Sequence, residues 1–230
     1  MPADDRLRPT VYLFDIDGTL LATGGAGRRA MEAAFAALTG RADACSGFSF
    51  AGMTDRAIAR AGLLAVAQSV TAERIDALLA AYLQSLAAEV SASRGYQVLP
   101  GVKDILSSLP GRGPCAIGLG TGNIRAGATI KLQRAALDQH FDFGGFGCDH
   151  EDRAELLRIG AERGASRLGH PCAACRVIVI GDTVRDVAAA LAIGAQCIGV
   201  GTGGTALTEL QQAGAAAVYP DLTTWDPDRT

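Results

Sequence analysis

The chain has 230 residues, enough for one α/β domain with a smaller inserted unit. Hydrophobic residues make up 49% of it, so a sizeable core can be buried. The formal net charge is −3 and charges of both signs are dispersed, which argues against a protein that binds nucleic acid or a membrane surface.

Targeting signals and disulfide bonds are not expected either. No apolar run reaches the 18 residues of a membrane span, and the start of the chain, MPADDRLRPT, lacks the apolar region of a secretory signal. We therefore expect a cytoplasmic protein, as a monomer or a homodimer, with its six cysteines reduced. Cys172 and Cys175 have CxxC spacing, but no second ligand pair accompanies them, which favours a structural role over zinc binding or redox chemistry.

The most informative stretch is VYLFDIDGTL, residues 11–20. Its four apolar or aromatic residues predict a buried β-strand, directly followed by Asp15, Asp17 and Gly18. In an open α/β sheet, ligands bind at the carboxyl ends of the strands. Two buried carboxylates there need a compensating charge, and the usual one is a hard divalent cation with oxygen ligands.

Between about residues 22 and 93 the pattern is helical. A helical segment is expected at about 28–38, followed by an irregular stretch at 41–53. Thr54 can cap the next helix, with Asp55 in its first turn, and a long amphipathic helix runs from about residue 71 to 90. The sequence thus predicts a helical domain at 22–93, inserted into a core formed by residues 1–21 and 94–230.

From Pro100 onward, helices alternate with strands. Helices are expected at about 102–109, 124–137, 153–163, 184–193 and 206–212. Strands are expected at 115–121, around 141–146, at 176–181, at 196–200 and, at an edge, at 216–219. This alternation implies right-handed βαβ units and a parallel sheet, and hence a Rossmann-like α/β fold.

Two later stretches also follow predicted strands and should meet Asp15 at one edge of the sheet. Thr121-Gly122-Asn123 offers a hydroxyl and free backbone N–H groups for a phosphate, although such a tripeptide also makes an ordinary turn. Asp182 leaves the sheet as Asp15 does, and Asp186 lies on the same side of the first helical turn. Carboxylates gathered in this way fit a magnesium site. The candidate metal ligands are Asp15, Asp17, Asp182 and Asp186.

These stretches resemble motifs of the haloacid dehalogenase superfamily. Residues 11–20 match its first motif, hhhDxDGTL with h apolar, and residues 181–186 match its fourth, GDxxxD. The resemblance implies that Asp15 is a nucleophile that forms an aspartyl-phosphate and that Asp17 is the general acid and base. It also implies that Thr121 binds the phosphoryl group.

In the fourth motif, the resemblance implies that Asp182 binds Mg²⁺ and that Asp186 orients a metal-bound water or a basic residue. That basic residue departs from the common pattern, because many relatives carry Lys-Pro about thirty residues after the second motif and this chain does not. Arg153 lies 32 residues after Thr121, at the start of a predicted helix, and is favoured as the cation. Lys131 is the alternative, but a helix beginning near residue 123 would carry it about 12 Å along the axis, away from the strand ends.

The helical insert matches the C1 cap type of phosphoglycolate phosphatase and β-phosphoglucomutase. The resemblance therefore implies Mg²⁺-dependent hydrolysis of a small phosphorylated metabolite. A phosphomutase and a non-catalytic phospho-ligand-binding protein of the same fold remain alternatives, whereas Asp17 disfavours a dehalogenase. In the cap, Thr54 and Asp55 are the expected substrate-binding residues. Some relatives have Gly-Arg-Thr-Asp there, and Met53 in place of that arginine disfavours a small carboxylated substrate.

Overall fold

The computed structural model describes residues 8–229. Residues 1–7, on which the expected absence of a secretory signal partly rests, and Thr230 lie outside this range. Within it, no helix is long and apolar enough to cross a lipid bilayer.

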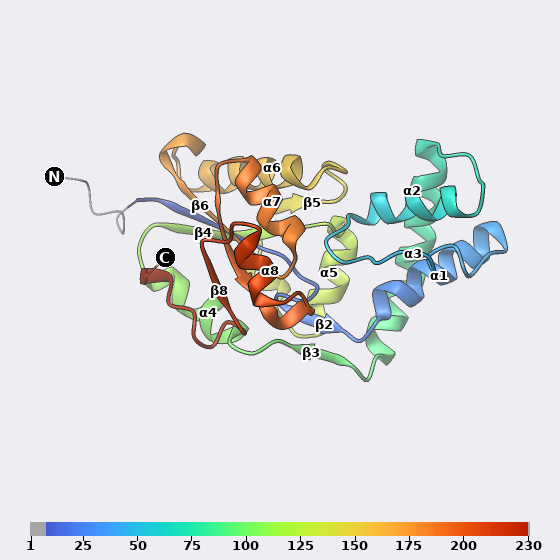
Figure 1. Cartoon of the computed structure of the whole chain (residues 1–230), viewed down its shortest axis with the longest axis horizontal. Coiled ribbons are helices and arrows are strands. Elements are labelled where there is room, and N and C mark those ends of the chain that lie inside the picture. The colour runs from blue at the N-terminus through green and yellow to red at the C-terminus, as the bar shows by residue number, and fades with distance from the viewer. Residues whose placement is uncertain (1–7, 230) are drawn as a thin grey trace.

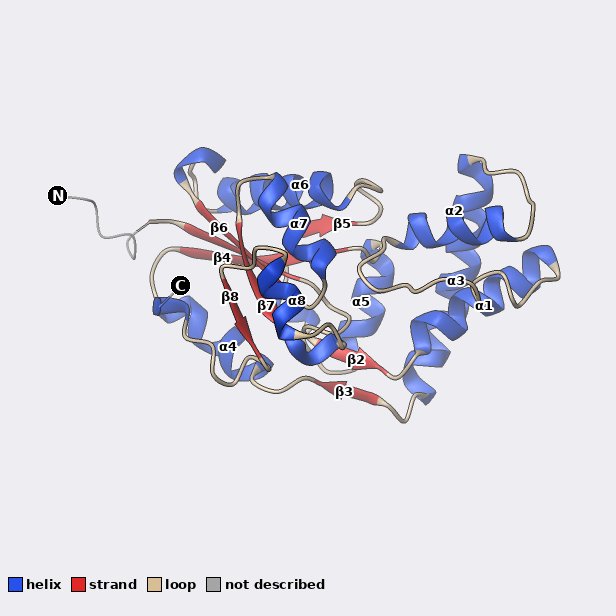
Figure 2. Ribbon diagram, viewed as in Figure 1, coloured by secondary structure: helices blue, strands red, loops and turns tan. Residues whose placement is uncertain are grey.

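A six-stranded parallel sheet forms the centre of the core (Figures 1 and 2). The strand order is β5-β4-β1-β6-β7-β8. Their bounds are β1 Thr10–Phe14, β4 Cys115–Thr121, β5 Gly144–Phe146, β6 Arg176–Gly181, β7 Gln196–Val200 and β8 Ala217–Tyr219. All of β1 is buried between β4 and β6, which explains why its sequence is continuously apolar rather than alternating.

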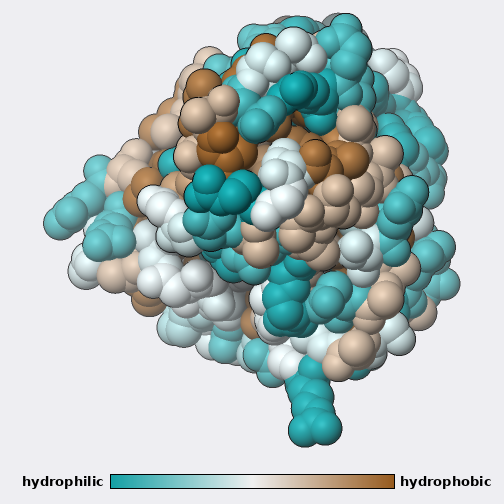
Figure 3. Space-filling view, turned by 90° about the vertical axis from the view of Figure 1, so that its right-hand side faces the viewer, coloured by the Kyte–Doolittle hydropathy of each residue, from teal (hydrophilic) through white to brown (hydrophobic). Residues whose placement is uncertain are grey.

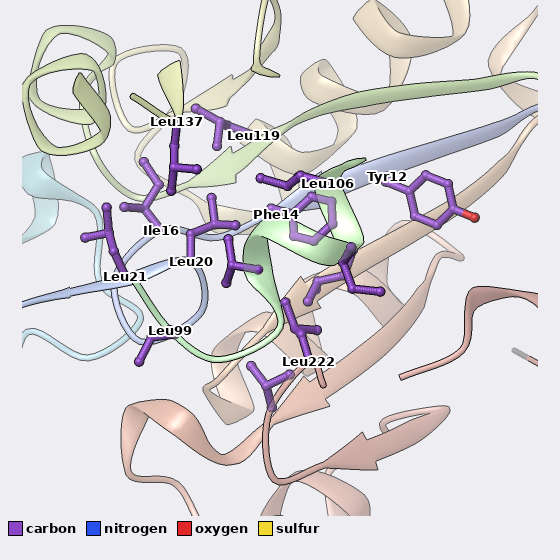
Figure 4. Close-up of a cluster of buried hydrophobic side chains, with 14 of the residues drawn as sticks. Tyr12, Phe14, Ile16, Leu20, Leu21, Leu99, Leu106, Leu119, Leu137 and Leu222 are labelled. Atoms are coloured by element: carbon purple, nitrogen blue, oxygen red, sulfur yellow. The ribbon is translucent and has the colours of Figure 1, made fainter. Parts of the chain in front are cut away.

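Helices cover both faces of the sheet, and successive residues of β1 point to opposite faces. Tyr12 and Phe14 belong to one hydrophobic cluster, together with residues of α4 (Val102–Ser108) and α5 (Arg125–Gln133). Figure 4 shows this cluster, in which Phe14 of β1 and Leu106 of α4 lie close together. Val11 and Leu13 pack on the other face against α6 (Arg153–Arg167), α7 (Val184–Ala192) and α8 (Leu207–Gln212).

The segment 22–93, which we call the cap, contains three helices at one end of the molecule (Figure 1). They are α1 (Ala26–Thr39), α2 (Asp55–Ala65) and α3 (Ala72–Ala92), and they enclose a separate hydrophobic cluster that includes Phe35, Ile75 and Tyr82. Figure 3 looks onto this end, where apolar and polar residues share the surface; the exposed Leu38 and Leu64 belong to α1 and α2.

Two antiparallel strands that the sequence did not predict connect the cap to the core. They are β2 (Leu21–Thr23) and β3 (Tyr96–Val98), which pair with each other. With three residues each, they are too short to carry a recognisable alternation of apolar and polar residues. Short 3₁₀ turns complete the chain at 109–111, 138–140, 172–174, 201–203 and 227–229.

Two helix ends differ from the sequence prediction. Helix α5 ends at Gln133 rather than near residue 137, and Ala136 adopts a positive φ of 53°. Helix α6 continues to Arg167 instead of ending near residue 163, because Gly164 serves packing rather than chain termination. A Cβ at that position would lie 2.4 Å from Val11 Cγ1, so glycine lets the helix approach the sheet closely.

Candidate active site

The three stretches with candidate site residues meet at the carboxyl edge of the sheet, because their strands are neighbours. Asp15 follows β1, Thr121 ends β4 and Asp182 follows β6, in the spatial order β4-β1-β6. Parallel pairing brings the carboxyl ends of these strands together.

Three carboxylates form a buried cluster at this edge. One oxygen each from Asp15, Asp182 and Asp186 lies within 4.8 Å of the others. Burial, followed by repulsion from Asp186 and Asp15, raises the pKa of Asp182 to about 8. A buried, oxygen-only donor set that repels itself in this way fits a hard divalent cation such as Mg²⁺. We expect these three residues to be the ones that hold the ion.

The Asp17 carboxylate lies outside this cluster, and the expectation that Asp17 is a metal ligand stays a prediction. Its Oδ2 atom is 2.6 Å from Lys131 Nζ and accepts a hydrogen bond from Asn123 Nδ2 at 2.9 Å. The chain has already left β1 and turns at Gly18, which has a φ of 83°. No strand therefore orients the side chains of Asp15 and Asp17 in the same direction.

Tight packing surrounds the Asp182 carboxylate. Thr19 Oγ1 donates a hydrogen bond to Asp182 Oδ1 at 3.0 Å. A Cβ at Gly18 would lie 2.5 Å from Asp182 Oδ2, and one at Gly203 would lie 1.6 Å from the same oxygen. Side chains are excluded at both glycines, which leaves room for the carboxylate beside the DGT turn.

Arg153, the first residue of α6, joins two of the clustered carboxylates. Its guanidinium lies 3.0 Å from Asp15 Oδ2 and 2.5 Å from Asp186 Oδ1, and the residue is 9% exposed. Burial by itself lowers the pKa of the Arg153 guanidinium. The nearby carboxylates of Asp186 and Asp15 raise it by more, so the net shift is upward. Burial raises the pKa of Asp15 to about 6, and Arg153 opposes that rise, so the arginine favours the ionised form of the Asp15 carboxylate.

Lys131 also reaches the site, and the expectation that it points away from the strand ends is wrong. Its buried ammonium contacts Asp17 and also donates a hydrogen bond to Asn123 Oδ1, 2.6 Å away. Helix α5 begins only at Arg125, and helical side chains lean back toward the amino end. In addition, Asp17 lies three residues beyond the end of β1, within reach of this lysine. Burial lowers the pKa of Lys131, but Asp17 and Asp55 raise it above its usual range.

The Thr121-Gly122-Asn123 stretch interacts with the side chains of Asp15, Asp17 and Lys131. Thr121 Oγ1 accepts hydrogen bonds from the Asn123 backbone N–H at 3.3 Å and from Asn123 Nδ2 at 2.8 Å. The Thr121 hydroxyl also lowers the pKa of Asp15. The side chain is fully buried and does not line the cavity described next, whereas Gly122 and Asn123 do.

A cavity of about 210 Å³ lies between the core and the cap. The core side presents Asp15, Asp17, Gly122, Asn123, Lys131 and Arg153, and Thr23 of the connecting strand β2 also lines the cavity. The cap side presents Gly27, Arg28, Met31, Phe50, Ala51, Gly52, Met53, Asp55, Ile58 and Tyr82. Thr54 is not among these residues, so its expected role in substrate binding stays a prediction. Its hydroxyl instead caps α2 by accepting from Ala57 N and donates to the Glu151 carbonyl of the core.

The start of α2 contacts the Thr121-Gly122-Asn123 stretch and the residue that follows it. Asp55 N donates to the Gly122 carbonyl at 2.8 Å, and Asp55 Oδ2 accepts from Ile124 N at the same distance. A Cβ at Gly122 would lie 2.3 Å from the Met53 carbonyl oxygen, so glycine permits this approach. Arg60 on α2 adds two hydrogen bonds to the Glu151 carboxylate.

A family model for haloacid dehalogenase-like hydrolases matches residues 9–194. The chain belongs to this family. The matched region contains the clustered carboxylates, both cations and the whole cap, which agrees with the resemblance seen in the sequence. A comparison with curated proteins finds no match.

Solved structures share the fold of this haloacid dehalogenase-like hydrolase. A hydrolase from Pseudomonas syringae is 24% identical with a TM-score of 0.68, and the match covers 94% of each chain. A predicted phosphatase from Clostridium acetobutylicum is 21% identical with a TM-score of 0.67, over 92% of this chain and 93% of the other. The protein CbbY from Rhodobacter sphaeroides, solved in complex with phosphate, is 16% identical with a TM-score of 0.66, over 94% of this chain and 96% of the other.

Several site residues of this hydrolase were not found from the sequence. Thr19 stands inside the DGTL motif, which was the available signal, and its hydroxyl donates to Asp182. Arg28 and Tyr82 gave no signal, because a basic residue and an apolar helix face are common in any helical domain. Only the packing of α1 and α3 brings these two side chains to the same cavity.

Proposed function

We propose that the protein is a Mg²⁺-dependent phosphatase that hydrolyses a small phosphate monoester through an aspartyl-phosphate. The observation that carries the proposal is the position of Asp15. Its carboxylate lines the cavity between core and cap, contacts a buried arginine and belongs to a carboxylate cluster that fits a divalent cation. The phosphate bound to CbbY, whose fold is similar, supports a phosphorylated substrate.

In the first step, an Asp15 oxygen attacks phosphorus and the bond from phosphorus to the leaving oxygen breaks. Asp17, which is 43% exposed at its side chain and faces the cavity, gives its proton to that oxygen. Arg153 stabilises the negative charge that develops on the phosphoryl oxygens. A bound Mg²⁺ would supply further neutralisation of charge between phosphate and carboxylates.

In the second step, Asp17 takes a proton from water, and the water oxygen attacks the phosphorus of the aspartyl-phosphate. The bond to Asp15 breaks, which releases phosphate and restores both aspartates. Lys131 and Asn123 share Oδ2 of Asp17 as their acceptor, so they keep this carboxylate directed at one place during both steps. The cap covers the site and limits the entry of other water.

A phosphomutase of the same fold would use the same aspartates but would hold a second phosphate against the cap. Arg28 is the one cation among the cap residues that line the cavity, and it already donates to the carbonyl oxygens of Cys45 and Phe48. This arrangement favours hydrolysis over transfer to a second phosphate-bearing substrate.

The proposal is tested with p-nitrophenyl phosphate as a generic monoester, assayed with Mg²⁺ and with EDTA. We expect turnover with Mg²⁺, almost none with EDTA, and almost none for Asp15→Asn. The matched control is Asp142→Asn, which changes a surface carboxylate paired with Arg167 and should retain full activity. Mg²⁺-independent turnover, or substantial activity in Asp15→Asn, would contradict the mechanism.

A further inference from the structure

Asp55 is a buried cap carboxylate with an unused oxygen that faces the cavity. The residue is 6% exposed and lines the cavity at the start of α2. Its Oδ2 atom accepts from Ile124 N, whereas no group within residues 8–229 donates a hydrogen bond to Oδ1. No lysine or arginine in that range lies within 4.0 Å of its carboxylate as an ion-pair partner. Burial raises the pKa of Asp55 to about 6, so the group is still ionised at neutral pH.

The other charged groups that line the cavity have partners. Arg153 is paired with Asp15 and Asp186, and Lys131 is paired with Asp17. A carboxylate of a ligand would therefore have to compete with existing ion pairs for either core cation.

The remaining cap wall is apolar apart from one arginine and one tyrosine. Met31, Phe50, Met53 and Ile58 supply the apolar surface. The Arg28 guanidinium lies 4.0 Å above the Phe50 ring and donates to two carbonyl oxygens, so it holds the cap loop in place. The one unpaired charge on the leaving-group side is thus the Asp55 carboxylate.

We propose that the substrate is the phosphate ester of a small alcohol that carries no negative charge and donates a hydrogen bond, from a hydroxyl or an ammonium group, to Asp55. This inference rests on the proposed phosphatase function and names its substrate class. A leaving group with a carboxylate would place like charges together in a site largely shielded from water. The cavity of about 210 Å³ is smaller than pockets for drug-sized ligands, which favours a small leaving group.

The test compares three esters with leaving groups of similar size: phosphoethanolamine, 2-hydroxyethyl phosphate and phosphoglycolate. They present an ammonium, a hydroxyl and a carboxylate at the same end of a two-carbon alcohol. We expect kcat/KM with Mg²⁺ to be about tenfold to a hundredfold higher for the first two than for phosphoglycolate, as for a hydrogen bond to a charged group. A preference for phosphoethanolamine over 2-hydroxyethyl phosphate would show that charge as well as hydrogen bonding is recognised.

The residue is tested with Asp55→Asn, which keeps an oxygen for Ile124 N and removes the charge. The readout is the ratio of kcat/KM for phosphoethanolamine to that for phosphoglycolate, because damage to the fold would lower both values and leave the ratio unchanged. We expect the ratio to fall at least tenfold. The control is Asp76→Asn, which removes an exposed cap carboxylate paired with Arg56 and should leave the ratio as in the wild type.

Turnover of p-nitrophenyl phosphate separates the two proposals. Hydrolysis of this ester with Mg²⁺ supports the phosphatase function whatever the substrate class. The substrate class is wrong if phosphoglycolate is the best of the three esters, if all three are inert, or if the kcat/KM ratio is unchanged in Asp55→Asn. If p-nitrophenyl phosphate and all three esters are inert with Mg²⁺, the phosphatase function itself fails.

Discussion

Replacing Arg153 by methionine should destabilise the metal-free protein more than any surface change on the same helix. The guanidinium lies 3.0 Å from Asp15 and 2.5 Å from Asp186, and all three residues are at least nine-tenths buried. Methionine preserves much of the side-chain volume but leaves two buried carboxylates without a cation. The substitution therefore tests the charge rather than the packing.

The magnitude follows from the geometry. At an effective dielectric constant of 20, unit charges 3.0 Å apart attract each other by about 5–6 kcal/mol, part of which offsets the cost of burial. Removing one partner of a buried pair typically costs about 3–5 kcal/mol. For a chain of this size that corresponds to a decrease in Tm of roughly 6–20 °C. Turnover should also fall by about 10²–10³-fold, because a cation facing transition-state charge is lost.

The measurement is thermal unfolding by circular dichroism at neutral pH in EDTA, for the wild type, Arg153→Met and Arg158→Met. Arg158 is the matched control, since it lies on α6 and also joins two carboxylates, Glu155 and Glu162. Its side chain is 47% exposed, so its loss should cost well under 1 kcal/mol. Equal shifts in Tm for the two variants would refute the argument that burial makes the Arg153 pairs important.

Three further predictions concern single features of the site. Asp15→Asn should abolish turnover without lowering the Tm of the metal-free protein, because one of several mutually repelling carboxylates is removed; a clear loss of stability would contradict this. Folding raises the pKa of Asp55 from 3.8 to about 6, so the wild type loses stability as the pH rises from 4 to 7 and Asp55 ionises. Asp55→Asn has no such carboxylate, so over this range its free energy of unfolding should increase relative to that of the wild type by on the order of 3 kcal/mol. Urea unfolding in EDTA at several pH values measures this gain, and a difference that does not vary with pH would show that Asp55 does not titrate as described. Replacing Cys172 and Cys175 together by serine should leave Mg²⁺-dependent turnover within about twofold, since both are free thiols away from the cavity; a large loss, or zinc bound in stoichiometric amount, would mean that the pair has a function.

The order of elements and the strand-end residues could be read from the sequence, because they depend on local patterns. A run such as Val11–Phe14 must be buried on both faces, and aspartates that follow such runs must lie at one edge of a parallel sheet. The positions of Asp15 and Asp182 follow from this rule, and that of Asp186 follows from the first turn of the helix after Asp182. The short strands β2 and β3 and the end of α5 at Gln133 did not follow, because neither carries a distinct local pattern.

The sequence by itself determined the parallel α/β architecture, the helical insert and the candidate nucleophile, since each rests on periodicity or on a motif within a few residues. Only the tertiary structure decided which carboxylates share a cluster, and it separated Asp17 from the other three. It also brought both Arg153 and Lys131 to the site, on different aspartates, where the sequence had suggested a choice between them. The cap wall around Asp55 is likewise tertiary, because it forms only where α1, α2 and α3 pack over the strand ends. Side-chain direction depends on where a helix begins and how it packs, and neither is encoded in the spacing of residues along the chain.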